Sequence, residues 1–405
     1  MPDHDPRRIH PSVFLFLIVP FGAMGGYLSV AIGYQLTQAG VSVEQVAALI
    51  AVSYIPQTWK FLWAPVADTT LSRKTWYLLA ALLSAVGIFV TGAIPADEQS
   101  LPLLYAAVLV SNVAVTFLAM ATESLMIYNT PPELHGRAGG WFQAGNLGGN
   151  GLGGGAGLWL AQTLPEPWMA GAALAAACAL CGAALWLVPE PPPLRRTGHY
   201  GRTLVAVLKD LWQVARTRAG ILALLICFLP IGSGAASNLW SAVADDWHAS
   251  ANTVALATGV FSGIVSALGC LVGGYVSDRM DRKTSYALYG LLMAMCTVAM
   301  ALAPRTEPMY IVFTLMYAFI QGLTYAGFTA VVLETIGLGA AATKFNLYAS
   351  LSNVPIAYMT LVDGWAHTRW GAAGLLGVEA AIGVVGIVVF VAVAMALPRR
   401  ALAAP

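Results

Sequence analysis

Apolar residues occur in long uninterrupted segments along almost the whole chain, and short polar stretches separate them. The segments that reach about 18 residues or more lie near residues 12–36, 43–64, 75–95, 102–128, 138–162, 168–188, 219–243, 252–276, 284–303, 308–335, 342–366 and 372–396. Each is long enough to cross the hydrocarbon layer of a bilayer, about 30 Å thick, as a helix. Because lipid offers the backbone no hydrogen-bond partner, helices rather than open sheets must span it. The pattern predicts an all-α membrane protein with twelve transmembrane helices.

The composition agrees with this prediction. Of the 405 residues, 58% are hydrophobic and only 10% are charged, whereas roughly a quarter of a soluble domain is charged. The first segment follows Arg7 and Arg8 but is far longer than the apolar core of a secretory signal, so we expect it to be a true span.

The basic residues gather on one side of the predicted bilayer. Of 20 Lys and Arg, only Arg305 and Arg369 belong to loops on the other side. The remaining 18 are Arg7, Arg8, Lys60, Arg73, Lys74, Arg137, Arg195, Arg196, Arg202, Lys209, Arg216, Arg218, Arg279, Arg282, Lys283, Lys344, Arg399 and Arg400. The positive-inside rule predicts that both termini are cytoplasmic, which agrees with an even number of spans.

A polar stretch at 189–218 divides the chain into residues 1–188 and 219–405, with six spans each. Prolines end the sixth span, and residues 203–215 are expected to form a short amphipathic helix. The division predicts two pseudo-symmetric six-helix bundles joined by a cytoplasmic linker.

The two halves repeat the same polar residue types at matching places. The matched positions are Asp68 and Asp278, Arg73-Lys74 and Arg282-Lys283, Glu123 and Glu334, and Asn146 and Asn353. Their separations along the chain stay near 210 residues throughout. Chance matches at all these places are improbable, so we interpret them as parts of one mechanism.

The stretch GGYVSDRMDRK, residues 273–283, resembles the loop signature of the major facilitator superfamily. In the first half, KFLWAPVAD at 60–68 departs from it because Ala64-Pro65 replace the leading glycines. That version resembles AmpG-type muropeptide permeases and their relatives, which include acetyl-CoA transporters and siderophore importers. Residues 36–68 and 341–366 also fit this subgroup, except at Lys344 and Ile356.

The resemblance implies that the loop residues act as a cytoplasmic gate that breaks and re-forms during alternating access. The implied gate consists of Asp68, Arg73, Lys74, Gly274, Asp278, Arg279, Arg282 and Lys283. The alternative is topological, because positive-inside sorting requires Arg-Lys loops in any case.

Two acids inside spans are the candidates for proton coupling. Glu123 and Glu334 lie late in the fourth span of each half, where an acid normally faces a cavity, pairs with a cation or exchanges a proton. The alternative is pairing at the inner gate with Arg73 and Arg282. Lys60 is expected to snorkel to the membrane interface, and Asp363 is expected at the opposite interface.

The resemblance also implies that the first, fourth, seventh and tenth spans line the central cavity. The candidate lining residues are Tyr27, Tyr34, Gln143, Asn146, Ser237, Asn238, Trp240, Gln321, Tyr325 and Asn353. Amides, hydroxyls and aromatic rings suit a sugar, peptide or chelate better than a bare ion.

A glycine-rich run, GNLGGNGLGGGAG at 145–157, lies within the fifth span and lacks the lysine of a phosphate loop. Small residues at this spacing predict tight helix packing. Gly145, Gly149, Gly153 and Gly154 also match the fifth-span motif of drug–proton antiporters, with Asn150 in place of its proline. The five cysteines lie within spans and are expected to pack in the core.

Neither a nucleophile–base pair nor a metal-ligand cluster stands out in the sequence, so we expect neither an enzyme nor a metal, cofactor or nucleic-acid site. The sequence predicts a monomeric, proton-coupled importer of a mid-sized organic solute in a bacterial inner membrane. Muropeptides are the leading substrate class. A siderophore importer and a proton-driven exporter of drugs or metabolites remain alternatives.

Overall fold

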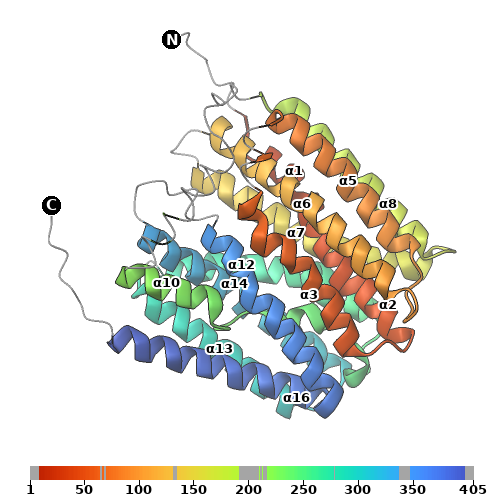
Figure 1. Ribbon diagram of the computed structural model, residues 1–405. Coiled ribbons are helices and arrows are strands. Elements are labelled where there is room, and N and C mark those ends of the chain that lie inside the picture. Colours follow the sequence, from red (N-terminus) through yellow and green to blue (C-terminus); the bar gives the residue numbers. More distant parts are fainter. Residues whose placement is uncertain are drawn as a thin grey trace, which may run out of the picture.

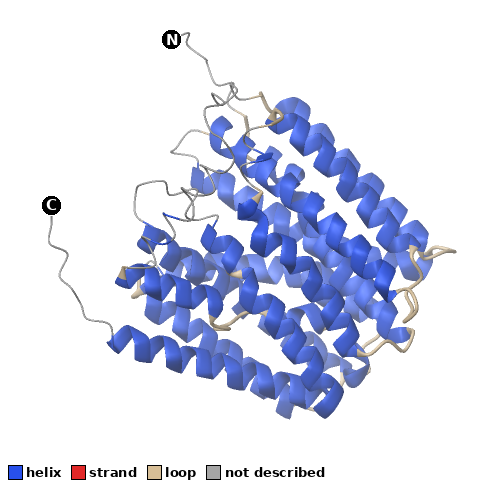
Figure 2. Cartoon of the chain, viewed as in Figure 1, coloured by secondary structure: helices blue, strands red, loops and turns tan. Residues whose placement is uncertain are grey.

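The structure is a computed structural model that describes residues 9–63, 66–67, 70–130, 135–190, 209, 212, 217–277, 279–336 and 347–396. Within these ranges the regular secondary structure is helical throughout, without a strand (Figure 2). The amphipathic helix predicted at 203–215 falls almost wholly outside the described residues.

The first half of the chain supplies six passes, drawn in red to yellow in Figure 1. They are α1 (Val13–Gly26) continued by η1 (Tyr27–Ile32) and α2 (Gly33–Gln38); α3 (Val43–Trp59) with η2 (Lys60–Leu62); α5 (Arg73–Ala93); α6 (Leu101–Asn129); α7 (His135–Thr163); and α8 (Trp168–Cys181) with η4 (Gly182–Leu187).

The second half supplies six more passes, drawn in green to blue beside the first six (Figure 1). They are α10 (Arg218–Phe228) with η5 (Ala235–Leu239) and η6 (Ala244–Trp247); α11 (Ala251–Thr253) with η7 (Val254–Phe261) and α12 (Ser262–Ser277); α13 (Arg282–Leu302); α14 (Glu307–Ile336); and the two halves of α16 (Asn353–Ala396). Gly371, at φ 65° and ψ −165°, separates these two halves.

Eight helical segments of the described chain are long and apolar enough to cross a membrane by themselves. The count differs from twelve for physical reasons. The helix α3 has only 17 residues, α7 is diluted by glycine, the seventh pass is interrupted, and both halves of α16 fall in one segment. The predicted all-helical fold of twelve passes is confirmed, although the seventh pass is not a continuous helix.

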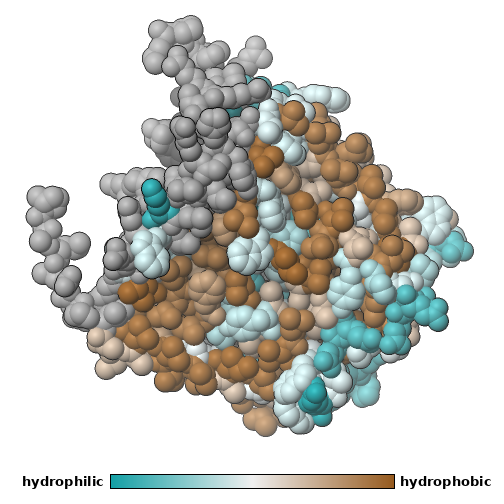
Figure 3. Space-filling model, in the orientation of Figure 1, coloured by the Kyte–Doolittle hydropathy of each residue, from teal (hydrophilic) through white to brown (hydrophobic). Residues whose placement is uncertain are grey.

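The described surface carries a broad apolar band with polar residues gathered towards one end of the helices (Figure 3). Large apolar side chains such as Trp186, Leu180 and Leu271 are 88%, 74% and 72% exposed. A soluble protein rarely exposes so much apolar surface, so this face is suited to lipid. We call the end with Lys60, Arg73 and Lys283 the basic end.

The other end of the bundle is here called the acidic end. Among the described residues its charged side chains are Glu44, Asp97, Glu98, Glu166, Asp245, Asp246, Glu307, Arg305 and Arg369.

The seventh pass is not the continuous span that the sequence predicts. The helix α10 ends at Phe228, Pro230 follows, and Gly232 and Gly234 adopt positive φ angles of 57° and 74°. Side chains satisfy the freed backbone carbonyls: Tyr358 donates to Phe228 at 2.8 Å and Tyr286 donates to Ile231 at 3.0 Å. A broken helix is tolerated at membrane depth only where its backbone groups find such partners.

Glycines bring α7 into direct backbone contact with helices on two sides. A Cβ atom built on Gly153 would lie 2.5 Å from the Cα atom of Ala23 in α1, and one on Gly155 would lie 2.6 Å from the carbonyl oxygen of Ala255 in η7. Gly149 similarly meets Val19 of α1. The packing predicted for the glycine run is therefore confirmed, and α7 contacts both bundles.

This packing predicts opposite effects for two Gly→Ala substitutions in the same helix. Alanine favours a helix by about 1 kcal/mol over glycine, and Gly148 faces open space, so Gly148→Ala should be neutral or stabilising. Gly153→Ala must push α1 away from α7 and should cost about 1–3 kcal/mol. Thermal unfolding of the purified protein measures both. Equal effects of the two substitutions would contradict the close packing.

Candidate functional site between the two bundles

A layer of hydrogen-bonded polar side chains joins the bundles near the middle of the molecule. The Tyr54 hydroxyl of α3 donates to Asn238 Oδ1 of η5 at 3.1 Å, and Asn238 Nδ2 donates to Thr360 Oγ1 of α16 at 3.0 Å. Asn238 thus contacts a donor from the first half and an acceptor from the second. We call Tyr54, Ser237, Asn238, Gln321, Tyr325 and Thr360 the polar layer.

The break in the seventh pass positions this layer. Gly234 has no side chain, and the amide of Gln321 from α14 fills the space that a Cβ would occupy. Gln321 Nε2 then donates to Ser237 Oγ at 3.2 Å. Tyr325, one turn further along α14, is 45% exposed although it lies within electrostatic range of Tyr54. The protein therefore covers only part of the Tyr325 ring.

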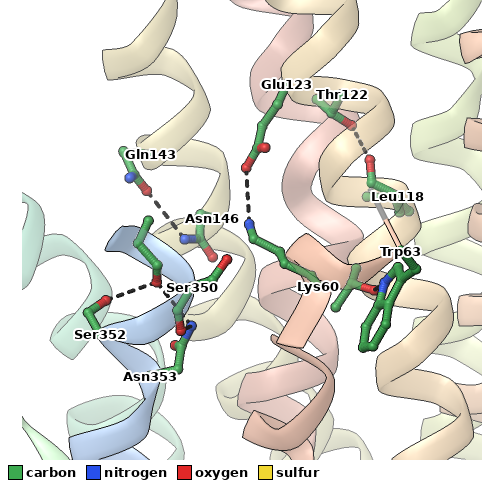
Figure 4. A network of polar contacts seen from close by, with 12 residues as sticks. Lys60, Trp63, Leu118, Thr122, Glu123, Gln143, Asn146, Ser350, Ser352 and Asn353 are labelled. Carbon is green, nitrogen blue, oxygen red and sulfur yellow. Dashed lines mark hydrogen bonds and ion pairs between the residues drawn. The ribbon is translucent and has the colours of Figure 1, made fainter. Parts of the chain in front are cut away.

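Lys60 and Glu123 form an ion pair within the first half, on the basic side of the polar layer. The Lys60 Nζ to Glu123 Oε1 distance is 3.6 Å, and the side chains are only 14% and 19% exposed. Figure 4 shows Lys60 reaching towards Glu123 on α6. The expectation that Lys60 snorkels to the interface is wrong, because its ammonium group finds a carboxylate inside the protein.

Amide side chains from α7 and α16 approach the same region (Figure 4). Asn146 Nδ2 donates to Gln143 Oε1 at 3.3 Å, and Asn353 Nδ2 donates to the carbonyl oxygens of Ala349 and Ser350 at 3.2 and 3.1 Å. The Asn353 amide thus donates to the helical turn that precedes α16. The side chain of Glu334 lies outside the described residues.

Three of the aromatic residues predicted to line the cavity are buried elsewhere. Tyr27 is 1% exposed and lies inside the first bundle, where its ring meets Gly157 and its hydroxyl meets Gly92. Trp240 is 3% exposed and packs edge-on against Tyr317, with ring centroids 5.2 Å apart. Tyr34 is buried near the acidic end, close to Asp245. Neither the rotation of each helix about its axis nor these contacts can be predicted from the pattern of residues along the chain.

In the first half, the predicted gate residues at the start of α5 contact the end of the sixth pass. The backbone N–H groups of Arg73 and Lys74 donate to the Glu190 carboxylate at 3.1 and 3.2 Å, a favourable place for an anion at a helix N-terminus. Arg73 Nε donates to Ser124 at 2.6 Å. The predicted pairing of Glu123 with Arg73 is therefore not observed: Arg73 contacts Ser124, and the cation paired with Glu123 is Lys60.

In the second half, the corresponding loop forms local contacts. The guanidinium of Arg279 stacks on Tyr275 at 3.3 Å from the ring centroid, and a Cβ at Gly274 would meet open space. Asp281 caps α13 by accepting from Thr284 N–H at 2.9 Å, and this hydrogen bond lowers the pKa of Asp281. Arg282 and Lys283 open α13, and Asp68 and Asp278 lie outside the described residues.

Contacts between the bundles close the acidic end. Gln38 Nε2 donates to Asp245 Oδ2 at 2.8 Å, and Ser241 Oγ donates to the carbonyl oxygen of Ser29. Gly364 of α16 lies against α3, where an added Cβ would be 3.1 Å from the Val43 carbonyl oxygen. Towards the basic end, Phe61 packs against a cluster of the second half that includes Cys227 and Tyr348. The polar layer lies between these contacts.

Sequence reasoning missed Glu379 and misplaced Asp363, two acids that lie buried in α16. Asp363, expected at an interface, is 0% exposed, and Glu379 is 6% exposed and accepts a hydrogen bond from the Tyr317 hydroxyl. A signal was present, because an acid within an apolar span marks a functional site by default. The expectation for Asp363 is wrong because the hairpin of α16 buries that side chain.

Comparisons with known proteins agree with this architecture. The model of the Major Facilitator Superfamily matches residues 14–358 and 222–404. No curated protein matches the sequence at a significant level.

Solved structures of transporters share the fold. A bacterial homologue of the human lysosomal transporter Spinster, in an inward-facing unoccupied conformation, has a TM-score of 0.75 at 13% identity over 97% of this chain and 98% of its own. A D-xylose–proton symporter gives 0.74 at 13% identity over 94% and 96%. The nucleoside transporter NupG gives 0.68 at 14% identity over 94% and 98%.

At such identities the solved structures establish the fold alone, and the family model, which covers most of the chain, establishes the relationship. The chain is a multi-pass membrane protein built as a transporter of small solutes, not an enzyme, and it belongs to the major facilitator superfamily.

Proposed function

We propose that this protein is a proton-coupled secondary transporter that imports a mid-sized organic solute by alternating access. The observation that carries the proposal is the polar layer, which lies where the two bundles meet and has the Lys60–Glu123 ion pair beside it. Solute sites of transporters lie near the midplane, at the interface of the repeats and often at a broken helix. The seventh pass breaks at this place.

The chemistry of the layer favours a solute with several hydrogen-bonding groups. Amide, hydroxyl and phenol groups from Asn238, Ser237 and Tyr325 suit sugars and peptides. Fragments of peptidoglycan combine both and are the leading substrate class. Siderophore chelates are the alternative within the importer class.

The ion pair offers a simple coupling scheme. In the empty protein, Lys60 and Glu123 neutralise one another. A solute carboxylate that binds the Lys60 ammonium leaves Glu123 without its cation, and a proton then neutralises Glu123. One proton therefore accompanies one solute carboxylate, and the charge at the site is unchanged. A D-xylose–proton symporter is among the proteins of similar fold, which supports proton coupling on this scaffold.

The charge distribution supports an orientation with the basic end in the cytoplasm of a bacterial cell and both termini on that side. In that orientation the acidic end lies outside the cytoplasm, so the described structure is closed towards the outside of the cell. A monomer is sufficient, since both halves of the site come from one chain.

A proton-driven exporter is the competing function, suggested by the glycines of the fifth span. Their packing against α1 accounts for Gly145, Gly149 and Gly153 without an antiport role. The direction of proton-driven flux separates the two functions.

The test of function uses purified protein in liposomes with an imposed inward proton gradient. We expect accumulation of a labelled anhydromuropeptide or, in a parallel assay, of a ferric siderophore. Loss of a preloaded dye driven by the same gradient, without uptake of either solute, would establish the exporter instead.

The coupling scheme predicts an asymmetric pair of mutants. Glu123→Gln keeps the shape but removes the exchangeable proton, so gradient-driven accumulation should fall about tenfold or more while solute exchange without a gradient continues. Lys60→Met should instead weaken binding of a carboxylate-bearing solute. The matched control is Glu166→Gln, at an exposed loop. Normal accumulation by Glu123→Gln would reduce Glu123 to a packing residue.

The acidic-end contact predicts a charge-dependent gate. Gln38→Glu places a second carboxylate opposite Asp245 and should separate the bundles, whereas Gln38→Lys should keep them closed. Spin labels at exposed Ala39 and Asn252, one in each half, measure the separation. Identical distance distributions in both variants would show that this contact does not control opening.

A further inference from the structure

Asp363, Glu379 and Tyr317 form a buried acidic cluster inside the second bundle, separate from Lys60 and Glu123. The Tyr317 hydroxyl donates to Glu379 Oε1, and both carboxyl groups lie within electrostatic range of Tyr317 and of each other. Asp363 Oδ1, Asp363 Oδ2 and Glu379 Oε2 have no hydrogen-bond partner among the described residues. Side chains this polar are rarely buried without partners.

The hairpin of α16 explains why the two acids meet. Asp363 lies eight residues before Gly371 (371 − 363) and Glu379 lies eight residues after it (379 − 371). At about 1.5 Å per residue, each acid is about 12 Å from the turn, so the antiparallel halves of α16 place them at the same depth. Tyr317 of α14 lies at the same depth as the two acids and contacts Glu379.

Among the residues that the structure describes, no cation neutralises the cluster. On α13 the neighbouring titratable group is Cys296, and on α14 it is Tyr317. On α16 itself, His367 is engaged with Asp246 at 2.6 Å. On α3, Ala47 and Val43 lie nearest to Gly364, and the titratable residue beside them is Glu44, whose Cα would be 3.2 Å from a Cβ at Gly364. Among the described residues the two acids face each other, the Tyr317 phenol and the Cys296 thiol. Uncharged polar groups complete the surroundings of Glu379, namely the backbone N–H of Ala236 and the hydroxyl groups of Ser233 and Thr297.

Two carboxylates in an apolar environment cannot both stay ionised without a cation, because desolvation and mutual repulsion oppose it. We propose that Asp363 and Glu379 share one exchangeable proton and form a second proton-binding site, which loads from the acidic end. The inference rests on the proposed proton coupling and assigns part of it to residues outside the solute site.

The position of Asp363 links this site to the gate. Its neighbour Gly364 forms the close contact with Val43 and Ala47 of α3. When the bundles separate at the acidic end, this contact opens and Asp363 becomes the first acid of the pair that water can reach. When the bundles close, as in this structure, water no longer reaches the pair and the proton stays on one of the two carboxyl groups.

A small cavity beside Glu379 is the exit that this proposal assigns to the proton. Glu379 lines it together with Ser233 of the seventh pass and Thr297 of α13. Ser233 belongs to the broken segment of the seventh pass, four residues before Ser237 of the polar layer. A proton that leaves Glu379 through this cavity arrives beside the solute site, and Glu379 becomes a carboxylate.

Infrared difference spectroscopy tests the site without any solute. Purified protein is taken from about pH 5 to about pH 8, and the carboxylic-acid C=O band is followed in wild type, Asp363→Asn, Glu379→Gln, Tyr317→Phe and the control Glu166→Gln. We expect one buried band that titrates in wild type and in the control, and that is lost or displaced in the other three variants. Tyr317→Phe keeps both acids, so it tests the cluster even where an acid variant folds poorly. A titrating band unchanged in all three would overturn the proposal.

A second measurement separates this inference from the proposed function. The spin-label distance between Ala39 and Asn252 should depend on pH in wild type and lose that dependence in Glu379→Gln. If the infrared band titrates but solute flux ignores the proton gradient, the proton site stands and proton-coupled transport fails. If flux is proton-driven and both acid variants keep the wild-type pH dependence, coupling resides at Glu123 and the second site is refuted.

Discussion

The close approach of α7 to helices on two sides is the constraint on which the rest of the structure depends. At Gly149 and Gly153 the backbone of α7 packs directly against α1, and at Gly155 it packs directly against η7 of the other half. One helix is therefore both a fixed member of its own bundle and the surface on which the partner bundle rests. Any side chain at these positions would separate the backbones, and the polar layer could no longer connect Tyr54 with Asn238.

Polar groups inside the protein are arranged around that contact in two tiers. The tier between the bundles contains Asn238, Gln321 and Tyr325, and it is completed only when both halves meet. The tier within the second bundle contains Asp363, Glu379 and Tyr317: the turn at Gly371 brings the two acids together, and α14 of the same bundle adds Tyr317. The first depends on the bundle arrangement, whereas the second persists through a rigid-body motion.

The sequence predicted the helices well because span length and the bias of basic residues are local signals. The sequence did not predict the features that depend on how the helices are arranged in space. Pro230 and Gly232 favour a break in the seventh pass, but they lie in a long apolar segment, and its length predicted a continuous helix. The partner of Lys60 could not be read from the chain, since several acids were equally available. The burial of Tyr27 depends on helix rotation, and the meeting of Asp363 with Glu379 depends on where α16 turns.

The acidic end has a consequence for how solutes arrive. Its described charges are seven carboxylates and two guanidinium groups, so its surface potential is negative over roughly a Debye length, about 8 Å at physiological ionic strength. Cations and hydronium are concentrated there and anions are diluted. Dissolved salt weakens both effects. The rate at which an anionic solute is captured therefore depends on the ionic strength of the medium before any contact with the binding residues is made.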